Sequence, residues 1–215
     1  MKRAAAITCL FLDVGGVLLT DGWSHGTSKL AARTFGLNLD ELKIRHNQAL
    51  DPYELGKFTI SEYLSQVVFY QKRPFTPAQF RKFMFAQSKP FPKMIELARR
   101  LKARYGLKIL VVNNEGHGLN EYRIQKFHLD GFVDFFISSC VVHLRKPDPD
   151  IFRMALETAQ VPPDRVVYID NTPMFVQIAK GLGIRSILHT DYRSTSSKLA
   201  AFGLPSGKGV VDETG

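Results

Sequence analysis

The segment LKILVVNN, residues 107–114, decides the fold because a nearly unbroken apolar run ends there in two polar residues. Apolar runs of this length suit strands that are buried on both faces of a parallel sheet. Four further runs have the same character: residues 6–12, 135–137, 166–169 and 184–188. Helical patterns alternate with these runs from 107 to 190. The alternation predicts an α/β fold with a doubly wound parallel sheet.

Apolar residues at helical spacing locate the helices between these strands. Residues 94–101 carry such a pattern, and Gly106 follows as a terminator. Pro149 suits the first turn of a second helix, and residues 177–183 close a third before the last strand.

A segment of roughly 70 residues interrupts this rhythm between the first two predicted strands. It is far longer than the usual βα loop of about 2–6 residues. Its apolar residues recur at helical spacing, and Thr76-Pro77 resembles a helix start. We therefore predict two domains: an α/β core over residues 1–22 and 93–215, and a small helical cap over residues 23–92.

Composition and charge narrow the functional classes. The 215 residues carry a formal charge of +9, but the basic residues are scattered, which argues against nucleic acid as the main partner. No apolar stretch approaches the ~20 residues that cross a bilayer, so we expect no membrane segment. Residues 1–4 are basic but lack the apolar region of a signal peptide. Two cysteines in apolar runs suit buried thiols and a reducing, cytoplasmic location.

Polar residues follow three of the predicted strands. Asp13 follows the first strand, Asn113 and Asn114 end the second, and Asp170 ends the fourth. Lys146 lies in the loop after the third strand. Parallel strands place these ends on one edge of the sheet, where α/β proteins bind ligands. We therefore expect two carboxylates, a lysine and amides in one crevice.

Four segments in this order resemble the motifs of the haloacid dehalogenase (HAD) superfamily. They are FLDVGGVL (11–18), VVNN (111–114), KPDPDIF (146–152) and VYIDN (167–171). The helical insert resembles that superfamily's cap, and residues 53–61 resemble a stretch common in such caps. The resemblance covers nearly the whole chain and implies a Rossmann-like core with a helical cap.

The resemblance also implies a chemistry and a role for each motif residue. Asp13 would be a nucleophile that forms an aspartyl-phosphate. Mg²⁺ would be held by Asp13, the carbonyl of Gly15 and Asp170. Lys146 would neutralise charge on the nucleophile and the phosphoryl group. Asn113 would hold a phosphate oxygen, with Asn114 and Lys146 completing the phosphate site. The implied function is a Mg²⁺-dependent phosphatase of small phosphorylated metabolites; the resemblance names neither the substrate nor an oligomeric state.

Three positions depart from the superfamily's phosphatase pattern. Gly15 stands where a second Asp normally acts as general acid and base, Asn113 replaces Ser or Thr, and Asn171 replaces a second acid. Loss of a general acid and base typically costs about 10²–10⁴-fold in rate. The candidate substitutes for this proton carrier are Asp21, His25, Glu115 and His117.

Two alternatives stay open at this point. One is a catalytically impaired HAD-like domain that binds a phosphorylated ligand or partner, which the three departures favour. The other is a metal-free 2-haloacid dehalogenase. Members of that branch resemble one another in having Tyr where this chain has Gly15 and Ser where it has Asp170. The retained Asp170 therefore favours metal and phosphate.

Overall fold

The computed structural model describes residues 6–206. The ends of the predicted core, residues 1–5 and 207–215, lie outside this range, as does the basic segment of residues 1–4. The elements in chain order are β1 Cys9–Leu12, α1 His25–Phe35, α2 Leu39–Glu54, α3 Ile60–Val67, α4 Pro77–Ala86, α5 Pro92–Tyr105, β2 Lys108–Asn113, α6 His117–Lys126, β3 Phe135–Ser138, α7 Ser139–Val142, α8 Asp150–Ala159, β4 Val166–Asp170, α9 Pro173–Gly181, β5 Arg185–Leu188 and α10 Tyr192–Ala201, with short 3-10 turns at Leu129–Gly131 and Pro163–Arg165.

Five strands of the described range form one parallel sheet in the order β3-β2-β1-β4-β5. The chain runs outward from β1 to β3 and then returns past β1 to β4. This order confirms the predicted doubly wound α/β sheet. It also places the topological switch point between β1 and β4, which is where open α/β sheets bind ligands.

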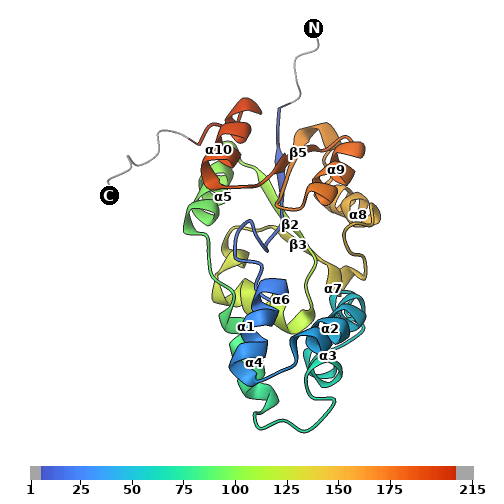
Figure 1. Cartoon of the computed structure of the whole chain (residues 1–215). Coiled ribbons are helices and arrows are strands. Elements are labelled where there is room, and N and C mark those ends of the chain that lie inside the picture. The colour runs from blue at the N-terminus through green and yellow to red at the C-terminus, as the bar shows by residue number, and fades with distance from the viewer. Residues whose placement is uncertain (1–5, 207–215) are drawn as a thin grey trace, which may run out of the picture.

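Helices cover both faces of the sheet (Figure 1). Leu10 and Leu12 pack into a cluster that contains residues of α5 and α10, whereas Cys9 and Phe11 pack with residues of α8 and α9. Successive residues of β1 point to opposite faces, so a strand covered on both sides must be apolar throughout. This explains the unbroken apolar runs in the sequence.

The segment between β1 and β2 is helical, as predicted. Within residues 23–92, whose backbone is described throughout, the only β pairing is an isolated bridge of Pro90 with Leu19. Helices α1 to α4 gather at one end of the molecule (Figure 1) and share a separate buried cluster. The phenyl ring of Phe80 lies at its centre, against the rings of Trp23 and Phe35. The exact domain boundaries stay a prediction.

Several local predictions are confirmed and two shift by a few residues. Thr76 caps α4, and Gly106 ends α5 in the left-handed conformation. Pro149 is the cap that precedes α8. The third predicted helix, α9, starts at Pro173 and ends at Gly181, two residues before the predicted end at Gly183. Cys9 and Cys140 are free and buried, as expected. Within residues 6–206, no helix has the length and apolar character to span a membrane.

The cap cluster predicts a difference in stability between two leucines. Leu64 on α3 is buried, whereas Leu30 on α1 is about half exposed. Leu64→Ala should lower the free energy of unfolding by about 2–5 kcal/mol because it leaves a cavity. Leu30→Ala, the matched control, should change it by less than about 0.5 kcal/mol. Urea unfolding measures both, and equal losses would contradict the burial of Leu64 in the cap cluster.

Candidate active site

Lys146 lies at the centre of the site. Its side chain is 1% exposed, and its Nζ lies 3.1 Å from Oδ1 of Asp13 and 2.7 Å from Oδ2 of Asp170. Asp13 directly follows β1, and Asp170 is the last residue of β4. These two strands are neighbours at the switch point. Burial lowers the pKa of Lys146, but the two carboxylates outweigh it and raise the pKa overall. The ammonium is therefore charged at neutral pH, and its two ion pairs keep the carboxylates of Asp13 and Asp170 close to each other.

Asp170 is fully buried and makes further contacts. Its Oδ2 accepts hydrogen bonds from Lys146 and from the hydroxyl of Tyr168, and its Oδ1 accepts one from the backbone N–H of Thr172 at 2.7 Å. Tyr168 and Asp170 are two residues apart on β4, so their side chains point to the same face. These bonds fix the orientation of the carboxylate.

Asp13 faces the pocket. Its Oδ1 accepts a hydrogen bond from the backbone N–H of Val14 at 2.8 Å. Burial raises the pKa of Asp13 to about 6, while Lys146 opposes the rise. The group is therefore mainly an ionised carboxylate at neutral pH, as a nucleophile or a metal ligand must be.

Gly15 and Gly16 differ in what their positions tolerate. A Cβ on Gly16 would lie 1.9 Å from Nδ2 of Asn171. Gly16 also has a φ of +71°, so glycine is required at this position. A Cβ on Gly15 would lie 3.6 Å from Cα of Asp21 and 3.9 Å from Nη1 of Arg123, which are ordinary contact distances. The turn therefore explains Gly16 but not Gly15.

The three asparagines of the motifs lie in different places. Asn113 is buried; its Nδ2 donates to Oδ1 of Asn120 at 3.2 Å, and its own Oδ1 has no hydrogen-bond partner. Asn114 lines the pocket and exchanges two hydrogen bonds of 2.8 Å with the backbone of Lys146. Asn171 lines the pocket as well. Asn114 thus fixes the lysine loop, and Asn113 belongs to a buried amide network.

The four candidate substitutes for a proton carrier also lie in different places. Asp21 lines the pocket beside Gly15, and its Oδ1 accepts a hydrogen bond of 3.4 Å from Asn171. Glu115 lines the pocket, but it forms an ion pair of 2.7 Å with Arg123. Burial raises the pKa of Glu115 to about 7, against the opposing charge of Arg123. His117 directs its Nε2 toward Gly56 of the cap side. The side chain of His25 is outside the described part.

These residues surround a pocket of about 340 Å³ between the sheet edge and the cap. The core contributes Asp13, Gly15, Asn114, Lys146 and Asn171. Asn113 and Asp170 are buried and do not line the pocket. The loop that leads into the cap contributes Asp21, and the cap contributes Trp23 and Glu54. Arg145, next to Lys146, forms ion pairs with Glu54 at 2.7 Å and with Asp51. This arrangement leaves a polar pocket between the two parts that has room for a small ligand.

Sequence reasoning missed several of these residues. Tyr168 sits two positions before Asp170, and that spacing on a strand was the available signal. Arg123 and Glu54 carry no such signal, because they lie on helices and reach the pocket through the packing of the cap on the core. The ion pair of Arg123 with Glu115 joins residues eight apart along the chain.

Lys146 is expected to be essential for stability. Lys146→Met leaves two neighbouring buried carboxylates without a counter-charge, and breaking such a buried pair typically costs about 3–5 kcal/mol. Urea unfolding at neutral pH measures the loss. The exposed Lys126→Met is the control and should change little. An unchanged stability of the Lys146 variant would contradict the geometry.

The comparison with known families agrees with this arrangement. A family profile described as haloacid dehalogenase-like hydrolase matches residues 7–183. The chain belongs to this hydrolase family. Residues 7–183 include both strand-end carboxylates, Lys146 and the helical insert.

Individual relatives of this HAD-like hydrolase are distant. Bifunctional epoxide hydrolase 2 of Sus scrofa is 25% identical over 213 residues, which cover 86% of this chain and 37% of that protein. The chain thus spans little more than a third of that relative. The HAD family enzyme BT-2542 of Bacteroides thetaiotaomicron has a TM-score of 0.73 at 20% identity, over 92% of this chain and 99% of that one. The L-2-haloacid dehalogenase of Xanthobacter autotrophicus has a TM-score of 0.60 at 14% identity, covering 92% and 84%.

Proposed function

We propose that this HAD-like hydrolase is a Mg²⁺-dependent phosphatase of small phosphate esters, with Asp13 as its nucleophile. The observation that carries the proposal is the pair of carboxylates, Asp13 and Asp170, held on one buried lysine beside a polar pocket. In support, BT-2542, which shares the fold, has been crystallised with magnesium and inorganic phosphate. The free, buried thiols favour a reducing, cytoplasmic setting for this activity.

The oxygen donors at this edge are of the kind that magnesium prefers. Among residues 6–206, no group of three or more His, Cys, Asp and Glu side chains could hold a metal ion. Mg²⁺ needs no such group, because it is usually bound by one or two carboxylates, with water and substrate phosphate completing the octahedron. Asp13, Asp170 and the carbonyl of Gly15 are the proposed ligands. When bound, the ion would screen the repulsion between the carboxylate of Asp13 and the phosphate.

The residues of the chain supply the remaining steps. A carboxylate oxygen of Asp13 attacks phosphorus, the ester P–O bond breaks, and the leaving oxygen departs with the bonding electrons and takes a proton from solvent water. A second water then attacks phosphorus, the P–O bond to Asp13 breaks, and phosphate and a proton are released as the carboxylate of Asp13 is regenerated. Lys146 neutralises negative charge on the nucleophile and on the transferring group. Asn114 holds the loop of Lys146 in place through its two hydrogen bonds to that backbone.

The phosphate is proposed to meet Asn114 and Lys146 rather than the amide nitrogen of Asn113. Both amides already donate one hydrogen bond, but Asn114 lines the pocket, whereas Asn113 is buried. For Asn113 to bind phosphate, its side-chain amide would have to rotate toward the pocket, or its backbone N–H would have to donate to the phosphate instead. The proposed cap, residues 23–92, closes the pocket from the opposite side and excludes water.

A second candidate function is a domain that binds a phosphorylated ligand without turning it over. Gly15 favours it, because the position has room for a side chain and carries none. The third candidate is dehalogenation of a 2-haloacid. Its support is the fold shared with L-2-haloacid dehalogenase, while Asp170 and the absence of a tyrosine at position 15 weigh against it.

One set of assays separates the three candidates. Phosphate release from 4-nitrophenyl phosphate should depend on Mg²⁺ and should be lost on chelation, and 2-chloropropionate should yield no halide. Phosphate binding without release would favour the binding domain. Halide release without metal would favour the dehalogenase. A panel of phosphorylated metabolites with Mg²⁺ then identifies the substrate.

A further inference from the structure

The cap joins the core through two connectors that pair with each other. Leu19 and Pro90 form an antiparallel bridge, and the backbone N–H of Thr20 donates to the carbonyl of Lys89 at 2.8 Å. The hydroxyl of Thr20 donates to the carbonyl of Gln87 at 2.8 Å and accepts from the N–H of Lys89 at 3.0 Å. Both chain crossings therefore form one short two-stranded hinge.

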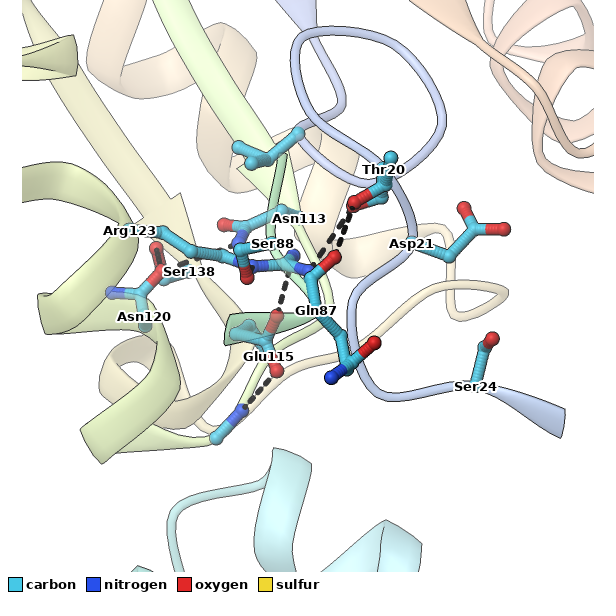
Figure 2. Close-up of polar contacts among 12 residues, drawn as sticks. Thr20, Asp21, Ser24, Gln87, Ser88, Asn113, Glu115, Asn120, Arg123 and Ser138 are labelled. Carbon is cyan, nitrogen blue, oxygen red and sulfur yellow. Dashed lines mark hydrogen bonds and ion pairs between the residues drawn. The ribbon is translucent and has the colours of Figure 1, made fainter. Parts of the chain in front are cut away.

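Arg123, on α6 of the core, reaches both connectors (Figure 2). Its Nη2 donates to the carbonyl of Thr20 at 3.2 Å, and its Nε donates to the hydroxyl of Ser88 at 3.0 Å. The guanidinium also packs tightly on the first connector: a Cβ on Gly22 would lie 1.8 Å from Nη2. Position 22 must be glycine for this approach, and its φ of +67° adds to the requirement.

The third contact of Arg123 leads into the pocket. Its Nη1 forms the 2.7 Å ion pair with Glu115, which directly follows Asn113 and Asn114. The backbone N–H of Glu115 donates to the hydroxyl of Ser139 at 3.0 Å. Figure 2 shows the guanidinium between Glu115 on one side and Ser88 and Thr20 on the other. One side chain thus joins both connectors to the loop that follows β2.

The chemistry of these contacts requires arginine. A planar guanidinium offers five N–H donors in a fixed fork and can hold three partners in fixed relative positions, which a lysine ammonium on a flexible stem cannot. Arg123 is 3% exposed, so its charge is costly unless it is paired. Glu115 supplies that pair. The named partners all lie at the junction of cap and core or on the pocket wall.

We propose that Arg123 is a positioning residue that fixes the cap over Asp13 by locking both connectors to the pocket wall. Its consequence for turnover rests on the proposed phosphatase function. Without the fork, Asp21 and Trp23, which follow the first connector and line the pocket, lose their fixed place over the nucleophile. Misplacement of about 1 Å can cost about 100-fold in rate.

The single tryptophan of the chain reports on this junction without any assay of turnover. Trp23 follows Gly22 directly, and its Nε1 donates to the hydroxyl of Tyr63 on α3 at 2.7 Å. Arg123→Lys keeps the charge and removes the fork. We expect its Trp23 emission to shift to the red and acrylamide quenching to rise. Lys126→Met, an exposed change on the same helix, should leave both at the wild-type values.

Kinetics provide the second readout. For 4-nitrophenyl phosphate, Arg123→Lys should lower kcat/KM by about 10–100-fold, while the inhibition constant of inorganic phosphate, which needs no cap contact, changes less than about twofold. Ser88→Ala removes one connector contact and keeps the ion pair with Glu115, so it should move both readouts in the same direction by less. If Arg123→Lys fails to fold, Ser88→Ala still tests the proposal.

The outcomes separate the two proposals. If wild type and variants release no phosphate, the proposed function fails, while the Trp23 signals still test the role of Arg123. If both variants show wild-type Trp23 emission and quenching, with only a lower melting temperature, Arg123 is merely structural and the inference is overturned. A loss of kcat/KM accompanied by an equal loss of phosphate affinity would overturn it too, because the defect would then lie in the phosphate site.

Discussion

Asp13→Asn is expected to abolish phosphate release from every ester. The amide is a poor nucleophile and a weaker ligand for a hard cation. The change is isosteric, so Lys146 keeps its contact with Asp170 and the fold should persist. By analogy with other nucleophile variants, the loss of kcat should be about 10³–10⁶-fold. A discontinuous assay with 4-nitrophenyl phosphate and Mg²⁺ measures it.

The matched control is Asp130→Asn, which makes the same chemical change at an exposed position far from the sheet edge. It should retain wild-type activity. A circular-dichroism melt of both variants establishes that the loss is chemical rather than structural. Full activity of Asp13→Asn would refute the aspartyl-phosphate mechanism for this protein, and trapping of labelled phosphate on the wild-type enzyme but not on the variant would support it.

Gly15→Asp is expected to raise the hydrolysis of alkyl phosphates. Wild type has no side chain at position 15 to protonate an alkoxide, so aryl phosphates, whose phenolates leave readily, should turn over far faster than sugar phosphates. An acid at this position should raise the sugar-phosphate rate by about 10²–10⁴-fold and should change the aryl rate little. The position accepts a Cβ at ordinary contact distances.

Gly15→Asn is the matched control, because it has the same size and cannot transfer a proton. It should leave the slow sugar-phosphate rate unchanged. Efficient alkyl turnover by wild type would instead mean that another group carries the proton. Asp21 is then the first residue to replace, since it lies beside Gly15, whereas Glu115 is paired with Arg123 and His117 points toward the cap. Asp21→Asn should in that case slow alkyl but not aryl esters.

The sequence by itself determined the sheet and the place of the site. Residues 9–12, 109–112 and 166–169 are apolar at successive positions, and only a strand covered on both faces buries such a run completely. Since the strands are parallel, the polar residues that follow them had to meet on one edge. Asp13, Asp170 and Lys146 were predictable for this reason.

The tertiary structure decided the rest, because it depends on contacts between segments far apart in the chain. Asn113 and Asn114 are neighbours with the same chemistry, yet only Asn114 lines the pocket, since alternate residues at a strand end point in opposite directions. No spacing in the sequence indicates that Arg123 reaches Thr20 and Ser88, 103 and 35 residues away. Such contacts arise from the docking of a helical cap on the sheet edge, and side-chain packing rather than periodicity sets that docking.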